Sequence, residues 1–456
     1  MTLLFTFISL LVLFLSAYLY RVASGENIWN LNMLNYSFVI IFLVAYISST
    51  IILLDLHIFG YSSTNMSKTI LGNNSRKIYI WGIVMWTMIG IPIGAILINL
   101  FSKGKSIDVL MKKYKTSNFS LNLGLSERNF FLVIMVSTFI ISFYNYIFRP
   151  EFNAIDAITK GASVVEGQII RRSAIQGSVN LILDILFNTG TLTMLNLISF
   201  VMMLNLRARH WRFLFIFGFL LITYLSLLVG NVTTILMYLV VLGFTRTMVK
   251  GVFLRLYEGL AVLIFIAFLF SFLKGYGDYS VFQVLYQYVL TRVVFSQISG
   301  TFFALEVFPI QHDFLWFSST GKELHSIMNL NFEESYGIVM MRFYNPEGIE
   351  AGSAGHFTTI FMGEAWANFG FLGIILAPLW VGGLLQSLNR WIINKSKNAI
   401  AIAIYTYLTV SFGYTSDFIG FYYPLGTISL LVGFFFTLWS IKYILVHKVK
   451  NIKSIH

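Results

Sequence analysis

The sequence predicts an all-α polytopic membrane protein. Of its 456 residues, 57% are hydrophobic and only 11% are charged, and the mean hydropathy is +0.78. Apolar stretches of about 18 residues or more recur along the chain, and each is long enough to cross a bilayer as a helix. A soluble domain of this size would need far more polar surface. The chain contains no cysteine, so a disulfide framework and a thiolate metal site are both excluded.

We expect about eleven membrane-spanning helices within one integral membrane domain, residues 1–456. The first helix could be mistaken for a signal peptide, but no basic segment precedes it and no small-residue cleavage site follows it. No internal repeat of the kind found in many transporters is apparent. The expected spans are residues 2–20, 36–56, 78–101, 129–148, 177–206, 213–229, 231–245, 256–274, 366–388, 399–416 and 422–441.

Basic residues in short loops predict the orientation, because such loops prefer the cytoplasm. Ser102–Lys115 carries five lysines and Arg207–Arg212 carries three arginines. Placing these segments and the basic C-terminal tail inside leaves the N-terminus outside. Three cations conflict with this arrangement because it places them outside: Lys68, Arg76 and Lys77. An additional N-terminal span would remove the conflict. Most of the net charge of +12 therefore reflects membrane topology, and we expect no nucleic-acid partner.

Two sizeable extracytoplasmic loops are expected, a first at residues 149–176 and a large one at residues 275–365. The large loop contains nine carboxylates and three histidines. Within it, residues 280–308 are apolar but interrupted by glutamine and arginine. We interpret this stretch as an interfacial or re-entrant helix packed on the bundle, and a further full span is the alternative.

Arginines on the extracytoplasmic side are candidate phosphate ligands. Arg292 lies within the apolar stretch, where a guanidinium is costly unless it reaches the headgroups or an anionic partner. Arg171 and Arg172 precede a span on the same side, and Arg342 lies in another apolar segment. A guanidinium is permanently charged and can bind two phosphate oxygens at once. Anchoring to lipid headgroups is the alternative for each arginine, but three separate sites beside apolar sequence favour a shared anionic group at membrane level.

The segment that leads into the ninth span carries a second group of candidates. Thr358 or Thr359 can cap the start of a helix. On a continuous helical track Glu364 follows His356 after eight residues, Asn368 follows one turn later, and the three form a polar stripe toward the bundle interior. One interpretation is a helix cap with a hydrogen-bonded packing network. In the other, His356 is the general base for a sugar hydroxyl, and the buried carboxylate of Glu364 orients the imidazole.

Common enzyme signatures are missing from the chain. It has no D-x-D pair, no H-E-x-x-H, no G-x-S-x-G and no P-loop. The loop at residues 57–77 contains no carboxylate, which argues against a lipid-linked glycosyltransferase that holds an acidic base and a metal there. A phosphate-handling site without carboxylate-bound metal must neutralise charge with arginine. We therefore expect neither a metal nor a cofactor.

The stretch GHFTTIFMGEAWANFGFLGIILAPLWVGGLL (Gly355–Leu385) resembles the end of the catalytic loop in bacterial O-antigen and related polysaccharide polymerases of the Wzy type. In that family a large extracytoplasmic loop late in the chain leads into a span with the pattern G-E-x-x-x-N-F-G-x-x-G. Every position of the pattern is filled, by Gly363, Glu364, Asn368, Phe369, Gly370 and Gly373. The predicted topology agrees with the family over most of the chain.

The resemblance implies a bundle like the metal-independent branch of the GT-C glycosyltransferases, in the bacterial cytoplasmic (inner) membrane with its active site facing the periplasm. Its implied substrates are oligosaccharide repeat units on undecaprenyl diphosphate, and the growing chain leaves its lipid diphosphate to join a hydroxyl of the incoming unit. Membrane lipids and a chain-length regulator are implied partners. Only Glu364, Asn368 and the glycines transfer from the motif, whereas the roles of His356 and Arg292 rest on position and chemistry.

Two other functions remain open from the sequence. An O-antigen ligase, which transfers finished polymer to the lipid A core, shares nearly all of these features, although the late loop and the ANFGFLG segment favour a polymerase. A flippase or other transporter requires a water-lined pathway with ionisable residues within its spans. Asp55 and Asp184 are the few candidates, and both lie near predicted span ends.

Overall fold

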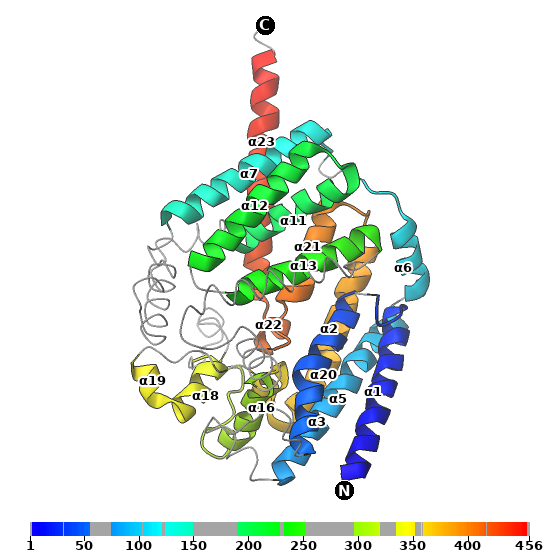
Figure 1. The fold of residues 1–456 in the computed structure, drawn as a ribbon, viewed down its shortest axis with the longest axis vertical. Helices are drawn as coiled ribbons and strands as arrows, with labels where there is room; N and C mark the ends of the chain where they lie inside the picture. Colours follow the sequence, from blue (N-terminus) through cyan, green and yellow to red (C-terminus); the bar gives the residue numbers. More distant parts are fainter. Residues whose placement is uncertain are drawn as a thin grey trace, which may run out of the picture. The chain divides into compact units, whose positions relative to one another are not determined.

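The computed structural model shows a helical protein (Figure 1). Within the described residues, β-structure is limited to an isolated bridge between Ser120 and Asn398. The described residues are 2–30, 32–54, 74–102, 104–120, 124–148, 189–228, 232–251, 296–319, 334–351, 357, 359–415 and 417–453.

Eight described helices are long and apolar enough to cross a membrane, so the predicted class, an all-α polytopic membrane protein, is confirmed. One of the eight is a continuous run that contains a π-helical segment. The eight are α1 (Thr2–Ser24), the run of α2 (Met33–Ile41), η1 (Phe42–Tyr46) and α3 (Ile47–Leu53), α5 (Asn74–Phe101), α7 (Glu127–Phe148), α11 (Thr189–Leu206), α12 (Arg209–Leu228), α20 (Phe361–Ile393) and α23 (Leu425–Lys453).

The described helices do not reach the predicted number of eleven spans. Helix α21 (Ala399–Ser411) is apolar, but its 13 residues are too few to cross a bilayer at about 1.5 Å per residue. Helix α13 (Val232–Lys250) occupies another predicted span but is not among the eight. The span predicted at 256–274 lies outside the described residues.

The chain divides into two compact units. Unit 1 consists of Met1–Lys112, Gly277–Trp391 and Phe412–Pro424. Unit 2 consists of Lys113–Tyr276, Ile392–Ser411 and Leu425–His456. Each unit therefore combines segments that are distant in the sequence.

In unit 1, helices α1, α5 and α20 lie side by side and run in the same direction (Figure 1). Hydrogen bonds link α1 to α5 at offsets of 72 to 76 residues, and α5 to α20 at offsets of 287 to 291 residues. A nearly constant offset along two helices means that they are parallel. The predicted alternation requires the first, third and ninth spans to cross in the same direction, and the structure agrees.

The run from α2 to α3 is antiparallel to α1, as expected for the next span. Tyr20 near the end of α1 bonds Ser37, whereas Ser9 near its start accepts a hydrogen bond from Tyr46 at 2.7 Å. The relative directions of the described unit 1 spans thus follow the predicted order.

Arg76, one of the three cations that conflicted with the positive-inside pattern, has a carboxylate partner in unit 1. Its Nη1 lies 3.1 Å from Oε2 of Glu306 on helix α16 (Ser296–Val307), and both side chains are partly buried. Tyr344 also donates to Glu306, at 3.0 Å. Glu306 belongs to the large predicted extracytoplasmic loop, so the ion pair joins Arg76 to a segment that is predicted to lie on the same side. Residues 280–295 of the apolar stretch at 280–308 lie outside the described residues, so the interfacial helix and the further full span both remain predictions.

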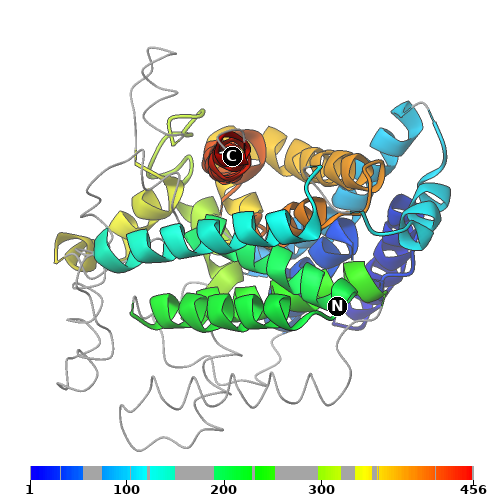
Figure 2. The same cartoon turned by 90° about the horizontal axis from the view of Figure 1, so that it is seen from above.

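Unit 2 packs its helices through aromatic rings and a few polar pairs. Figures 1 and 2 show α7, α11 and α12 side by side. Trp211 at the start of α12 donates to Glu127 at the start of α7, at 3.2 Å, and Phe139 packs on Phe217 further along. These two helices are therefore parallel, as the predicted topology requires of the fourth and sixth spans.

Candidate functional site

The N-terminal end of α20 carries the sequence motif and is the centre of the candidate site. The helix begins at Phe361, and Phe357, Thr359 and Ile360 before it are not helical. The prediction of one helical track from residue 356 onward is therefore wrong. Thr359 does not cap the helix either, because its hydroxyl bonds Thr301 and donates to the carbonyl of Ile360.

Glu364 lies in the first turn of α20 with 1% of its surface exposed. Its Oε2 accepts a hydrogen bond of 2.8 Å from the backbone N–H of Ile419, and its Oε1 accepts one of 3.4 Å from the hydroxyl of Ser319. Ile419 is the first residue of the short helix α22 (Ile419–Tyr422), and the N-cap side chain of that helix makes no capping bond. The carboxylate of Glu364 supplies the missing acceptor from a distant part of the chain.

Asn368, one helical turn after Glu364, is fully buried and uses both ends of its amide. Its Nδ2 donates to the carbonyl of Glu364 at 3.1 Å, which confirms that the two residues share one helix face. Its Oδ1 accepts a hydrogen bond of 3.0 Å from the N–H of Phe317 and one of 3.3 Å from Ser319. Glu364 and Asn368 thus hold one loop at Ser319 and a second at Ile419.

A break in α20 at Gly370 explains how the loop that contains Ser319 (the first loop) packs against this helix. Gly370 has φ 55° and ψ −134°, the mirror image of extended backbone, which glycine adopts readily and other residues do not. The break frees the carbonyls of Ala367 and Asn368 from the helix ladder. They accept hydrogen bonds from Leu315 and Trp316 at 2.8 Å and 3.3 Å.

The last glycine of the motif is required by the same break. A Cβ atom at Gly373 would overlap the carbonyl of Ala365, and one at Gly370 would lie 2.9 Å from Cζ of Phe314. The spacing G-x-x-G in this chain therefore lets the second half of α20 restart close against the first half. The acidic, amide and glycine positions of the motif act together to shape one end of one helix.

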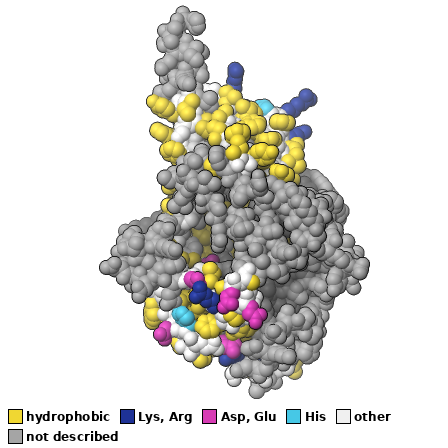
Figure 3. All heavy atoms as spheres, turned by 90° about the vertical axis from the view of Figure 1, so that its left-hand side faces the viewer, with side chains coloured by type: hydrophobic (Ala, Val, Ile, Leu, Met, Phe, Trp, Pro, Cys, Tyr) yellow, Lys and Arg dark blue, Asp and Glu magenta, His cyan; other side chains and the backbone are white. Residues whose placement is uncertain are grey.

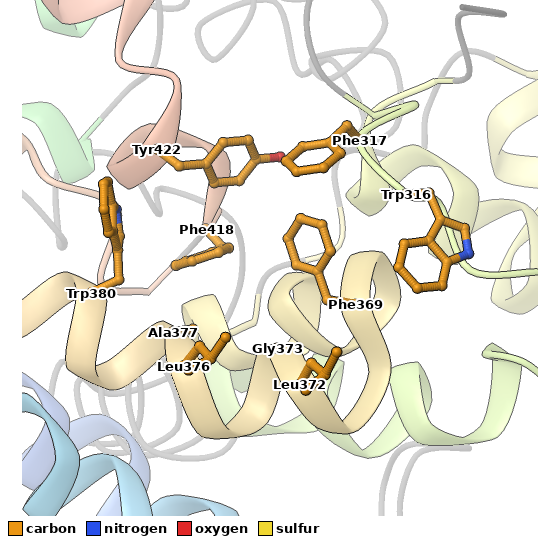
Figure 4. A pocket seen from close by; sticks show the side chains of 10 residues that line it. All are labelled: Trp316, Phe317, Phe369, Leu372, Gly373, Leu376, Ala377, Trp380, Phe418 and Tyr422. Atoms are coloured by element: carbon orange, nitrogen blue, oxygen red, sulfur yellow. The ribbon is translucent and has the colours of Figure 1, made fainter.

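Beside this network lies an apolar groove of about 350 Å³ (Figure 4). Its walls come from the first loop, which contains Ser319, from α20, and from the second loop, which contains Ile419. All three lie in unit 1. Figure 4 shows Phe369 of the motif between Trp316 and Phe418, with Leu372 and Leu376 along the helix. The lining residues are Trp316, Phe317, Phe369, Leu372, Gly373, Leu376, Ala377, Trp380, Phe418 and Tyr422.

Tyr422 joins the groove to the polar network. Burial raises the pKa of its hydroxyl, and the negative charges of Glu364 and Asp417 raise it further. The hydroxyl is therefore protonated throughout the physiological pH range. The edge of an otherwise apolar groove thus carries a hydrogen-bond donor.

Arg342, the one candidate arginine among the described residues, lies elsewhere in unit 1. It is on helix α18 (Tyr336–Tyr344) and pairs with Glu334 at 2.6 Å, with 58% of its side chain exposed. Figure 3 shows acidic and basic side chains gathered on the lower part of the face that includes α18 and α19 (Pro346–Glu350). The structure does not bring Arg342 into the network of Glu364 and Asn368. The other candidates lie outside the described residues: Arg171, Arg172, Arg292 and His356.

Sequence reasoning missed the second loop. It predicted spans at 399–416 and 422–441, whereas α21 ends at Ser411 and residues 412–424 fold into unit 1. The reason is that Phe361 donates to the carbonyl of Tyr414 at 3.2 Å and Glu364 accepts from Ile419. The dense aromatic sequence FGYTSDFIGFYY was the available signal, since it continues an apolar run with small and polar residues that a regular span does not need.

Within the described part of the chain, no group of three or more His, Asp or Glu side chains lies close enough to hold a metal ion. Comparison of the chain with known protein families, with functionally characterised proteins and with solved structures finds no match. The functional argument therefore rests on the motif and on its geometry.

Proposed function

We propose that the protein is a metal-independent glycosyltransferase that polymerises lipid-linked oligosaccharide repeat units. It joins units carried on undecaprenyl diphosphate into an O-antigen or a related surface polysaccharide, at the periplasmic face of the bacterial inner membrane. The proposal extends the resemblance of Gly363–Gly373 to the polymerase motif, and it includes the expected bundle like that of the GT-C glycosyltransferases.

One observation carries the proposal: two residues of the motif, Phe369 and Gly373, line an apolar groove. Glu364 and Asn368 fix the two loops whose aromatic residues, with Phe369, line the groove. A groove of this lining suits the first isoprene units of a lipid tail, because burying each CH₂ group contributes about 0.8 kcal/mol. The motif therefore has a role in binding a lipid-linked substrate without contacting the sugar itself.

The reaction forms one bond and breaks one. The acceptor hydroxyl oxygen attacks C1 of the sugar at the reducing end of the growing chain, and the C1–O bond to the diphosphate breaks with both electrons passing to the diphosphate. We assign Arg292, Arg171 and Arg172 to the diphosphate, where fixed positive charge stabilises the departing group. His356 takes the hydroxyl proton. Glu364 acts as a positioning residue, since its carboxylate holds the loops.

The test is a synthesis assay with purified protein in liposomes that contain undecaprenyl-diphosphate-linked repeat units as the only substrate. We expect a ladder of chain lengths without added metal or nucleotide-sugar. Arg292→Ala and His356→Ala should abolish the ladder at normal protein level, whereas Arg209→Ala, an exposed arginine on the predicted opposite side, should not.

The other possible outcomes would identify a different function or would exclude a residue from the proposed mechanism. Transfer of preformed lipid-linked polymer to an added lipid A core acceptor, with no ladder from repeat units alone, identifies a ligase. Movement of the lipid-linked unit across the bilayer without any bond formation identifies a flippase. Normal ladders from both site variants would remove Arg292 and His356 from the mechanism.

A further inference from the structure

Three lysines from three distant segments meet in unit 2, where two helices end and another begins. Lys115 is on α6 (Ile107–Thr116), Lys250 is the last residue of α13, and Lys397 precedes the first residue of α21. The three are close enough to interact, since the charges of Lys250 and Lys115 both act on Lys397. Three segments that the sequence places in the cytoplasm thus contribute one cation each to a single place.

Lys397 is buried although it is charged, with 8% of its surface exposed. Its Nζ lies 3.5 Å from the carbonyl of Lys115 and 5.9 Å from the centre of the Tyr114 ring. The N–H of Ser120 donates to the carbonyl of Lys397 at 2.9 Å, which fastens this backbone in place. An ammonium has three donors, and among the described residues no carboxylate pairs with this one.

Tyr114 adds a buried hydroxyl without a hydrogen-bond partner near Lys397. The residue is 3% exposed, and its hydroxyl has no hydrogen-bond partner among the described residues. Burial raises the pKa of this hydroxyl, so it stays protonated at neutral pH. A buried polar group without a partner is costly, which makes it a candidate for contact with a ligand.

The start of α21 completes the positive environment. This helix of 13 residues begins at Ala399, two residues after Lys397, so the positive end of its dipole lies close to this lysine. Asn398 caps one N–H by accepting from Ala401 at 2.7 Å. Apart from the carbonyl of Lys115, the groups named here are cations, a hydroxyl donor and the positive end of a helix.

We propose that Lys397, with Tyr114, Lys115 and Lys250, forms a binding site for a phosphate group, supplied by the headgroup of an anionic phospholipid. A phosphate oxygen accepts hydrogen bonds from an ammonium and a hydroxyl at once, and its charge removes the repulsion among the three lysines. The lipid is the favoured source because the site lies at the ends of apolar helices, on the predicted cytoplasmic side, where basic pockets between helices bind anionic headgroups. The site shares no residue with the groove beside Glu364.

The experiment measures lipid retention by native mass spectrometry of the purified full-length protein, with phosphatidylglycerol or phosphatidylcholine added. The wild-type protein should retain phosphatidylglycerol in preference. Lys397→Gln should lower that retention by about threefold or more, and Tyr114→Phe, which removes one hydroxyl and keeps the ring, should lower it to a smaller extent. Lys397→Arg should retain most of the preference.

Lys395→Gln is the matched control, because it removes an exposed lysine two residues away. Equal retention in Lys397→Gln and Lys395→Gln would overturn the proposal. A second arm follows the melting temperature in lipid-free detergent as inorganic phosphate replaces chloride at constant ionic strength. A response to phosphate that depends on Lys397, without any preference for phosphatidylglycerol, supports the site and overturns the lipid as its source.

Discussion

Glu364 in unit 1 and Lys397 in unit 2 are both charged and both buried, with 1% and 8% of their surfaces exposed. Their surroundings differ. The carboxylate accepts hydrogen bonds from the N–H of Ile419 and the hydroxyl of Ser319. The ammonium has one carbonyl near it, at 3.5 Å, and two further cations. Burial of a charge is tolerated when the protein supplies its partners, and otherwise something outside the chain must supply them.

The difference distinguishes a buried charge that stabilises the fold through hydrogen bonds from a buried charge that we propose binds a ligand. Glu364 is surrounded by donors, and its effect is to hold two loops that are distant in the sequence. Lys397 also has donors and positive charge near it, but these have the same sign as its own charge and repel it. The same burial therefore predicts opposite consequences when each charge is removed.

The largest effect is expected from Glu364→Ala. The substitution leaves the N–H of Ile419 without its acceptor, at a cost of about 1–3 kcal/mol, and removes one of the two acceptors of the Ser319 hydroxyl, the other being Oδ1 of Asn368. We expect a clear fall in the melting temperature of the purified protein. Glu364→Gln, which keeps one acceptor oxygen, should fall between the alanine variant and the wild type.

Glu350→Ala is the control for this measurement, since Glu350 is an exposed carboxylate at the end of α19. It should leave the melting temperature unchanged. If Glu364→Ala and Glu350→Ala have the same melting temperature, the carboxylate of Glu364 does not hold the loops. The proposed difference between Glu364 and Lys397 would then be wrong for Glu364.

A smaller effect, of opposite sign, is expected from Lys397→Gln in detergent without phosphate or anionic lipid. Burial and the charges of Lys250 and Lys115 lower the pKa of Lys397 below its ordinary value of 10.5. The charged form is therefore less favourable in the folded protein than in the unfolded chain. This penalty is complete below the folded pKa and disappears as the pH rises toward 10.5.

Lys397→Gln should accordingly melt above the wild-type protein at neutral pH, and the difference should shrink as the pH rises toward 10.5. Melting temperatures across this range, with Lys395→Gln for comparison, measure the effect. A difference that stays constant with pH would show that the repulsion among the three lysines does not act on stability.

Much of this architecture could be predicted from local patterns. Hydropathy is a property of the sequence alone, and it located the described spans to within a few residues at most of their ends. The i, i+4 spacing placed Glu364 and Asn368 on one face, which the bond from Asn368 to the carbonyl of Glu364 confirms. The basic loops predicted that Lys115, Lys250 and Lys397 share one side of the membrane, and the structure brings these three together.

The partners of these residues could not be predicted in the same way. Ser319 lies 45 residues before Glu364 and Ile419 lies 55 residues after it, and no local pattern connects them. The break at Gly370 interrupts a continuous apolar run, so hydropathy does not reveal it. It exists because two freed carbonyls find N–H donors on another loop. Such pairings depend on tertiary structure, which a single sequence does not display.

The smallest effect on stability is expected from Arg342→Ala, which tests a charge that is not buried. Arg342 and Glu334 are 58% and 38% exposed, and an ion pair between solvated side chains contributes about 0.2–1 kcal/mol, less at high salt. The melting temperature should therefore stay close to that of the wild type. Because Glu334 already pairs with this guanidinium, we expect the loss of polymer synthesis to be smaller than for Arg292→Ala, as measured by kcat/KM with lipid-linked repeat units. A fall in melting temperature as large as that of Glu364→Ala would show that exposure does not distinguish the charges that support this fold.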